Sequence, residues 1–372
     1  MSKLSVEVLE VLDVLPHPNA DRLDLITILG WQCIVQKDTI KAGDLVVYFP
    51  IDSVLTEPLM DKLFGADAKV KPSGSRIRTI KLRGAISQGL AVPIKSFSLE
   101  GGRCKVGCDL TEYFGVTKWE PPITKSTCSN LKPAPKKNQN ENFSKYTDIE
   151  HLKKYPKELE GKEVVVPEKI HGTNFRAGWC ERPARSLWER IKEKFGFWND
   201  KSEFCWGSHN VQLQRKKSKL KTYHYETAKT DVYTEAVIRY QLESILPKGF
   251  IIYGEIYGDG IQKNYMYGCK TGERKAVFFD VKHNGKYMSP PIAESFFDRL
   301  CLPQPPVLYK GIFDMKKMEE LVTGKSVLCP EQPIREGIVI KPYVEQDSYM
   351  GRLALKFLNP EYLLLKDNTE NH

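Results

Sequence analysis

The chain has 372 residues, of which 41% are hydrophobic and 28% are charged, and its 56 Lys and Arg exceed its 47 Asp and Glu to give a net charge of +9. This composition excludes a mainly disordered chain, and the length fits two domains better than one. No apolar run reaches the roughly 18–20 residues of a membrane span, and the first residues lack the apolar core of a signal peptide. We therefore expect a cytoplasmic or nuclear protein without a secretion signal, which does not enter a membrane and whose basic excess permits polyanion binding.

The first third of the chain contains short strand-like runs separated by turn signals. These runs cover residues 5–15, 23–29, 31–35 and 45–49. Many short strands at this spacing predict a small β-barrel or sandwich, which we place at residues 1–117. A polar stretch rich in Pro and Lys follows, and we interpret residues 118–142 as a linker.

The remainder of the chain, residues 143–372, shows a mixed pattern. Strand-like runs occur at residues 163–166, 174–179, 250–257, 276–282, 337–341 and 353–357, and helix-like runs at residues 187–195, 231–246, 292–300 and 313–322. The two kinds of run interleave without a regular βαβ alternation. This pattern favours an α+β domain over a doubly wound parallel sheet.

One segment of this second domain, residues 164–175 (VVVPEKIHGTNF), can present a nucleophile. A β-run delivers Glu168 and Lys169 to a tight turn at Gly172, from which a second strand leaves. Lysine attacks only in its neutral form, so burial or neighbouring positive charge must ease the loss of its proton. Taken alone, a lysine three residues before a glycine is more often a surface residue beside a turn.

Four downstream segments place charged or aromatic residues inside apolar strands. They are residues 253–258 (YGEIYG), 277–281 (VFFDV), 336–341 (EGIVIK) and 353–357 (LALKF). Carboxylates and lysines in buried strands are costly unless they are paired or bind a ligand. Separate structural ion pairs would account for any one of these segments.

In this order the five segments resemble the motifs of the covalent nucleotidyltransferases, which comprise ATP-dependent DNA and RNA ligases and mRNA capping enzymes. Residues 168–175 are similar to the RNA ligase form of the nucleophile motif, with His171 where DNA ligases prefer Asp. Residues 260–264 (GIQKN), which follow Gly254-Glu255, resemble the corresponding segment of the phage-type RNA ligases that seal nicks. Residues 16–23 (PHPNADRL) resemble OB-fold tRNA-binding modules. An OB-like module before a ligase domain resembles the RNA ligase family known from Deinococcus and Naegleria.

The resemblance implies an N-terminal β-barrel (OB-fold) that binds RNA or a nick, followed by an α+β nucleotidyltransferase domain of the ATP-grasp-like ligase type. It implies an ATP-dependent RNA ligase that joins a 3′-OH to a 5′-phosphate through lysyl-AMP and an AMP-capped 5′ end. The expected substrates are nicked duplexes with an RNA 3′-OH strand or RNA–DNA hybrids, with a role in RNA repair. ATP would be a substrate and Mn²⁺ or Mg²⁺ the cofactor, and we expect the protein to act as a monomer.

The resemblance also assigns roles to individual residues. Lys169 would attack the α-phosphorus of ATP, Phe279 would stack on adenine, and Glu255 and Glu336 would hold the metal ion. The expected ATP- or AMP-binding set is Glu168, Ile170, His171, Asn174, Arg176, Glu255, Phe279, Lys341 and Lys356. Lys341 and Lys356 would neutralise the phosphates. Ligases with a trailing OB domain use it to orient pyrophosphate, so here we expect Arg22, Asp21 and Asp24 of the N-terminal module to do so.

Two positions depart from the family pattern and leave alternatives open. Leu358 stands where related ligases carry a second lysine, and His209 is the only basic residue where many carry an arginine. Arg176 and the basic run at residues 215–221 are candidates to compensate. The alternatives are a DNA ligase or capping guanylyltransferase, which usually carries its OB domain after the catalytic domain, and a catalytically idle RNA-binding protein.

Overall fold

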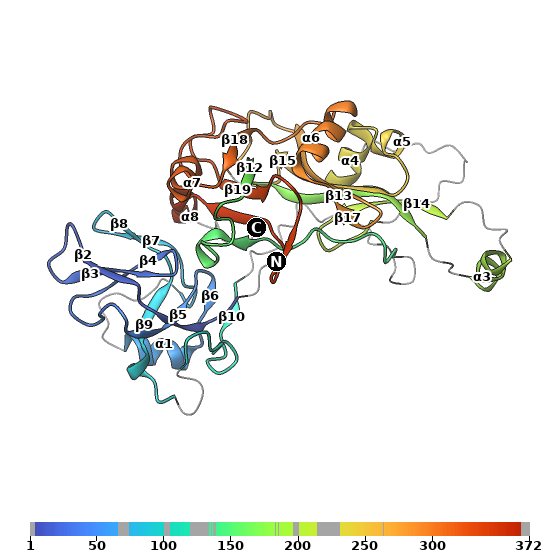
Figure 1. Ribbon diagram of the computed structural model, residues 1–372. Helices are drawn as coiled ribbons and strands as arrows, with labels where there is room; N and C mark the ends of the chain where they lie inside the picture. The colour runs from blue at the N-terminus through green and yellow to red at the C-terminus, as the bar shows by residue number, and fades with distance from the viewer. Residues whose placement is uncertain are drawn as a thin grey trace.

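The computed structural model describes residues 4–65, 74–99, 105–119, 134, 136, 139–182, 184, 186–195, 201–213, 231–262 and 264–365. The basic run at residues 215–221 and most of the predicted linker lie outside these ranges. Figure 1 shows a small β domain, in blue, followed by a larger domain that runs from green to red. The order of a mainly β domain before an α+β domain matches the expectation. None of the described helices is both long and apolar enough to span a membrane.

The N-terminal domain is built on two three-stranded sheets. One sheet orders β1 (Glu7–Glu10), β5 (Leu45–Phe49) and β9 (Leu90–Pro93), and the other orders β2 (Asp13–Pro16), β3 (Leu23–Ile28) and β4 (Trp31–Gln36). Two short pairs complete it: β6 (Ser53–Val54) with β10 (Thr117–Lys118), and β7 (Ile80–Leu82) with β8 (Ala85–Ser87). Because β10 includes residue 118 and pairs with β6, this domain continues past the boundary predicted at residue 117.

The predicted strands of this domain are largely confirmed, with one split and one helix that was not expected. The strand expected at residues 5–15 is two strands, β1 and β2, and they belong to different sheets. A helix, α1 (Glu57–Phe64), follows β6 and has a proline at its start. Proline is tolerated there because the first N–H groups of a helix have no partner within it.

The second domain has two five-stranded sheets. The first orders β11 (Glu150–His151), β22 (Leu355–Leu358), β19 (Gly337–Pro342), β12 (Glu163–Lys169) and β18 (Val307–Ile312). The second orders β14 (Ser202–Ser208), β13 (Thr173–Glu181), β15 (Phe250–Gly258), β16 (Arg274–His283) and β17 (Lys286–Tyr287). A hairpin of β20 (Asp347–Ser348) and β21 (Gly351–Arg352) lies before β22. The chain passes from the first sheet to the second at residues 170–172, directly after Lys169.

Helices cover the sheets of the second domain and supply much of its apolar core. α4 (Val232–Arg239) and α6 (Pro290–Arg299) pack on the second sheet, and α7 (Met315–Val322) packs on the first. The helix expected at residues 231–246 is interrupted, because Gln241 adopts a left-handed φ of 51° between α4 and α5 (Leu242–Ile245). The other α-helices among the described residues are α3 (Leu187–Lys194) and α8 (Pro360–Leu364).

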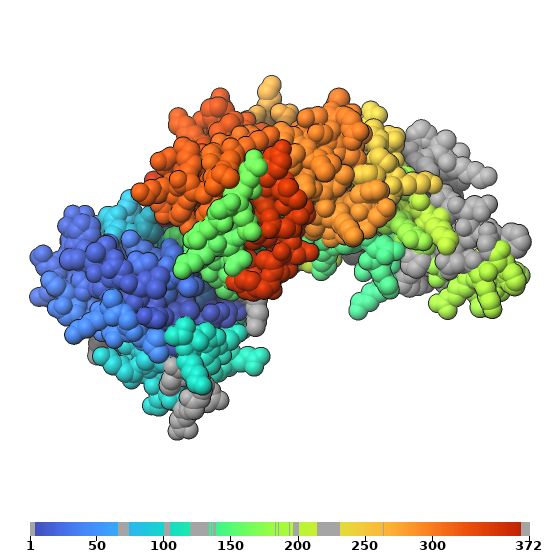
Figure 2. All heavy atoms as spheres, in the orientation of Figure 1, coloured from blue at the N-terminus to red at the C-terminus, as the bar shows by residue number. Residues whose placement is uncertain are grey.

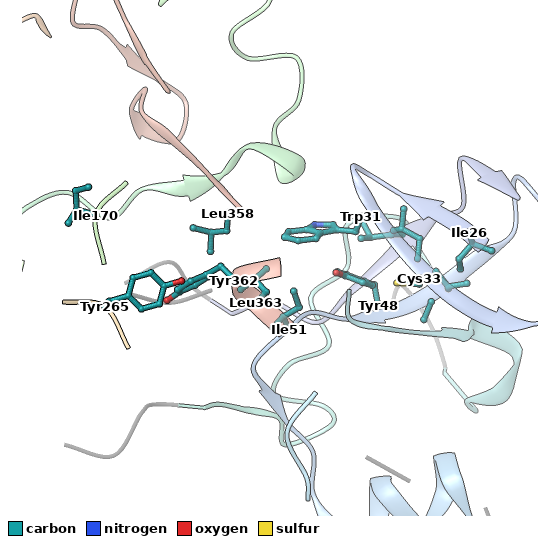
Figure 3. Close-up of a cluster of buried hydrophobic side chains, with 14 of the residues drawn as sticks. Ile26, Trp31, Cys33, Tyr48, Ile51, Ile170, Tyr265, Leu358, Tyr362 and Leu363 are labelled. Carbon is teal, nitrogen blue, oxygen red and sulfur yellow. The ribbon is translucent and has the colours of Figure 1, made fainter. Parts of the chain in front are cut away.

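The two domains share one hydrophobic core. It joins Trp31, Tyr48 and Ile51 of the N-terminal domain to Leu358 and Tyr362 of the second domain, as Figure 3 shows. In the space-filling view the blue domain lies directly against the green and red segments (Figure 2). Burial of apolar surface at about 25 cal/mol per Å² makes such a core a strong constraint on how the domains sit.

Candidate functional site

A cavity of about 300 Å³ opens between strands of the two sheets of the second domain. Much of the expected nucleotide-binding set lines it: Glu168, Lys169, Ile170, Asn174, Glu255, Phe279, Lys341 and Lys356. These side chains come from β12, β13, β15, β16, β19 and β22 and from the loop after β12. The structure therefore gathers into one site residues that are up to 188 positions apart in the sequence.

Lys169 ends β12 and faces a carboxylate. Its Nζ donates to Oε1 of Glu336 at 2.7 Å, and the Lys169 side chain is 13% exposed whereas that of Glu336 is fully buried. The register of β12 and β19 pairs Lys169 with Gly337, which puts Glu336 next to the lysine. The antiparallel pairing of two predicted strands thus brings the expected nucleophile and an expected metal ligand together.

Gly172 is required by close packing of the loop after Lys169. A Cβ on Gly172 would lie 2.2 Å from the carbonyl oxygen of Ile256 and 2.9 Å from Cγ of Glu255. Nε2 of Gln262 also donates to the Gly172 carbonyl at 2.8 Å. Only glycine fits this approach, and it allows Glu255 to lie against the loop that carries the lysine.

Two carboxyl groups lie close to Lys169, the half-buried Glu255 and the fully buried Glu336, and both have a raised pKa. Burial, and then the nearby charge of Glu336, raise the pKa of Glu255 to about 8, while Lys169 acts in the opposite direction. Burial also raises the pKa of Glu336, against the effect of Lys169 and then of Lys356. Oε2 of Glu336 has no hydrogen-bond partner among the described residues. Two carboxyl groups in this arrangement can bind a cation or share a proton.

Lys341 lines the cavity, but its ammonium group is bound by Phe279 and Asp280 of β16. Its Nζ donates to the carbonyl oxygen of Phe279 and to Oδ2 of Asp280, each at 2.8 Å. Arg352 donates to both Asp280 oxygens, and Tyr146, which also lines the cavity, donates to Oδ2. Two cations thus hold the pKa of Asp280 below its ordinary value despite burial. Lys341 therefore supports the Phe279 platform, and this pairing does not favour its expected phosphate-neutralising role.

His171 and Arg176 do not line the cavity. His171 is 2% exposed and lies behind the lysine, with Nδ1 at 3.2 Å from the Tyr362 hydroxyl and 3.8 Å from Oε1 of Glu336. The Arg176 guanidinium donates to the carbonyl oxygens of Ser208 and Phe143. Direct contacts of these two residues with nucleotide are therefore not supported, although His171 touches a residue that binds Lys169.

The N-terminal candidates for pyrophosphate binding are also absent from the cavity lining. Asp21 and Arg22 are exposed, and Oδ2 of Asp24 accepts from the Asp38 amide, which fixes the turn after β4. The residue of the N-terminal domain that does line the cavity is Trp119.

Trp119 is held at the cavity by contacts of both its backbone and its ring. Its amide donates to the Asp52 carbonyl at 2.8 Å, and the Arg76 guanidinium stacks on its ring at 3.4 Å. Arg76 is in turn paired with the buried Asp52 at 2.6 Å. Trp119 was not predicted from the sequence, because a single aromatic residue before a polar stretch carries no local signal.

The two departures from the family pattern have structural explanations. Leu358 is 1% exposed and packs into the core shared by the domains, where a lysine would bury an unpaired charge. His209 lines the cavity with Nε2 at 3.9 Å from Asp148, and burial is the main cause that lowers its pKa to about 4. His209 is therefore neutral near pH 7 and cannot supply the charge of an arginine.

Comparisons with known proteins support the fold and the family. A family model described as RNA ligase matches residues 162–358, and one described as an OB-fold domain matches residues 5–94. No curated protein matches the chain.

Several solved structures share the fold. A mutant of Naegleria gruberi RNA ligase with ATP and Mn has a TM-score of 0.73 and 24% identity, over 98% of this chain and 100% of that chain. The same enzyme with PPi has a TM-score of 0.70 and 24% identity, over 98% of both chains. Another of its mutants, with AMP and Mn, has a TM-score of 0.73 and 23% identity, over 99% of this chain and 100% of that chain.

Proposed function

Because the chain belongs to the RNA ligase family, whose model matches more than half of its length, we propose that it seals breaks in RNA at the expense of ATP. The observation that carries this proposal is Lys169 at the cavity wall, bound to Glu336 at 2.7 Å and close to Glu255. An idle RNA-binding protein would not need two carboxyl groups beside a lysine in the wall of such a cavity.

In the proposed first step, the amine of Lys169 attacks the α-phosphorus of ATP. An N–P bond forms, the P–O bond to the β-phosphate breaks, and pyrophosphate leaves. Glu336 is the nearest acceptor for the proton that the lysine must lose. The AMP then passes to an RNA 5′-phosphate, and a 3′-hydroxyl displaces AMP to form the phosphodiester.

The cavity also offers places for the nucleotide. Phe279 provides an aromatic face for adenine. Oε1 of Glu168 and Oδ1 of Asn174 are buried acceptors without partners among the described residues, and both side chains line the cavity. We assign them to donors on the base or ribose. Lys356 is the lysine best placed for the phosphates, since it lines the cavity and lowers the pKa of Glu336.

A divalent cation fits the carboxylates beside Lys169. The described residues contain no group of three or more His, Cys, Asp or Glu that could hold a metal ion by themselves. Mg²⁺ and ions like it are usually held by one or two carboxylates together with substrate phosphates and water. We therefore propose Glu255 and Glu336 as the protein ligands of Mn²⁺ or Mg²⁺. Such an ion would neutralise charge that develops on the phosphates.

The covalent intermediate provides the first test. We expect the protein to form an acid-labile adduct when it is incubated with α-labelled ATP and metal, and not with labelled GTP. Lys169→Ala should abolish the adduct, and Lys169→Arg should not restore it, because a guanidinium stays protonated. An adduct that forms on either variant would show that another residue is the nucleophile. Labelling by GTP alone would indicate a capping activity.

The substrate needs a second test. We propose that nicked duplexes, including RNA–DNA hybrids, are sealed according to the sugar of the 3′-OH strand, as would suit RNA repair in the cytoplasm or nucleus. The 2′-hydroxyl is the group that distinguishes RNA from DNA. A nick made with RNA or DNA on each side gives four substrates, and sealing should follow the 3′-OH side and weaken as salt rises. Efficient sealing of the all-DNA nick would contradict this specificity.

We also propose that the protein acts as a monomer. The apolar face of the N-terminal domain around Trp31 and Ile51 is covered by the same chain's second domain, so it needs no second copy. Sedimentation of the protein at working concentration tests this point.

A further inference from the structure

We propose that Tyr362 is a positioning residue that couples the docking of the N-terminal domain to the geometry of Glu336 and His171 beside the nucleophile. This inference rests on the proposed ligase function, because its consequence is a change in the rate of Lys169 adenylylation. Tyr362 belongs to α8, a short helix that follows the last expected motif. It does not line the cavity.

The start of α8 is bound to the backbone around Glu336. The amide of Asn359 donates to the carbonyl oxygen of Glu336 at 2.9 Å, and Nδ2 of Asn359 donates to the carbonyl of Arg335 at 3.2 Å. Oδ1 of the same fully buried Asn359 accepts from the amide of Glu361 and caps the helix. Any shift of α8 must therefore move or strain the segment that carries Glu336.

The Tyr362 side chain extends this link to the atoms nearest Lys169. Tyr362 is fully buried, its hydroxyl lies 3.2 Å from Nδ1 of His171, and Tyr362 is among the groups that lower the pKa of Glu336. A buried hydroxyl at this position restricts the orientation of the imidazole and, through it, of the neighbouring carboxylate. Nδ1 of His171 in turn lies 3.8 Å from Oε1 of Glu336, which is the oxygen that binds Lys169.

The opposite side of α8 contacts the N-terminal domain. Tyr362 and Leu363 belong to the shared core with Tyr48 and Ile51, and Figure 3 shows Tyr362 between Tyr265 on one side and Leu363 and Ile51 on the other. One short helix therefore connects the domain contact to the carboxylate of the active site.

The chain contains a matched control for the hydroxyl. The Tyr265 ring also lies edge-on to His171, with centroids 4.8 Å apart against 5.2 Å for Tyr362. Both tyrosines are buried, but the Tyr265 hydroxyl has no hydrogen-bond partner among the described residues. Tyr→Phe at the two positions removes the same atom, and only at Tyr362 is that atom bonded to the site.

The experiment measures single-turnover formation of the labelled adduct on the full-length protein at several ATP concentrations. Tyr362→Phe should lower the limiting rate about tenfold, as for loss of a hydrogen bond to a charged group, with the ATP concentration at half-maximal rate unchanged. Tyr265→Phe should stay within about twofold of wild type. Equal rates for the two variants, or an effect of Tyr362→Phe on ATP concentration dependence alone, would overturn the proposal.

A second variant tests the coupling itself. Leu363→Ala loosens the contact with the N-terminal domain without touching His171 or Glu336, so it should also slow adenylylation. Its effect should be less than additive with Tyr362→Phe, because both act through α8. Full additivity would show that the two contacts are independent. If the wild-type protein forms no adduct, the proposed function fails; if it does and Tyr362→Phe matches it, only this inference fails.

Discussion

At the scale of single residues, the protonation of Glu255 makes the stability of the nucleotide-free protein depend on pH. Its pKa is about 8 in the folded protein and near 4.5 ordinarily, so the folded state binds more protons than the unfolded state between these values. Stability should therefore fall as pH rises from about 4.5 to about 8, by up to about 1 kcal/mol per pH unit. Urea unfolding of wild type and Glu255→Gln should show a shallower slope in the variant, whereas Glu10→Gln, at an exposed position, should keep the wild-type slope.

Two lysines of the cavity should respond differently to removal. Lys356→Ala should slow adenylylation by orders of magnitude, since its proposed partners are the phosphates. Lys341→Met breaks a buried ion pair with Asp280 and should cost about 3 kcal/mol of stability, measured by urea unfolding. If Lys341→Met kept wild-type stability and lost only ATP affinity, this result would support the expectation that Lys341 neutralises the phosphates.

The sequence indicates a shared site most clearly for residues whose strands carry their own pattern, and their roles stay predictions. Glu255, Phe279 and Lys356 stand inside apolar runs, and the structure places all three at the cavity. Trp119 and Tyr362 were not predicted, because the sequence around each of them shows no pattern that indicates a functional residue. Their roles follow from contacts with Asp52 and His171, which are distant in the sequence.

At the scale of elements, the predicted strands with continuous apolar runs are confirmed within a few residues, and two of the missed elements, β18 and α8, have weak local patterns. β18 is an edge strand whose residues are mostly exposed or half-buried, so it shows no clear alternation. α8 spans only five residues and is set by its Asn359 cap and its packing. Short elements of this kind depend on tertiary contacts more than on propensity.

The loop between β12 and β13 can be tested through its glycine. Gly172→Ala would place a methyl group against the Ile256 carbonyl and Glu255, so the loop must move and Lys169 with it. We expect adduct formation to fall by at least about a hundredfold while the protein stays folded, because small displacements of reacting groups are costly. Gly161→Ala is the control: it has a φ of +70° but open space around its Cβ, so it should lose only about 1 kcal/mol of stability. Normal labelling of Gly172→Ala would show that the loop adapts.

At the scale of the whole molecule, the contact between the domains should be sensitive to acid at His151. This residue is buried against Trp31, with ring centroids 4.4 Å apart, and burial, then Lys153 and Lys356, hold its pKa well below 6.5. The unfolded chain takes up a proton below about pH 6.5 and the folded protein does not, so stability is lost as pH falls. The loss should be about 1 kcal/mol between pH 6.5 and 5.5.

His151→Gln isolates this contribution, because every other titrating group is common to the variant and the wild type. The difference in unfolding free energy between the two proteins should shrink as pH falls from 7.5 to 5.5. A difference that stays constant over this range would show that His151 takes up its proton in the folded state.

The pairing of β11 with β22 has a consequence for how fast the protein folds. These parallel strands join Glu150 to Leu355 and His151 to Lys356, and the ring of His151 also meets the amide of Leu358, 207 positions along the chain. Contacts between such distant segments carry a large loop-closure entropy and form slowly. We therefore expect the strand pairing that completes the sheet around Lys356 to form late in folding, after the local hairpins of the chain.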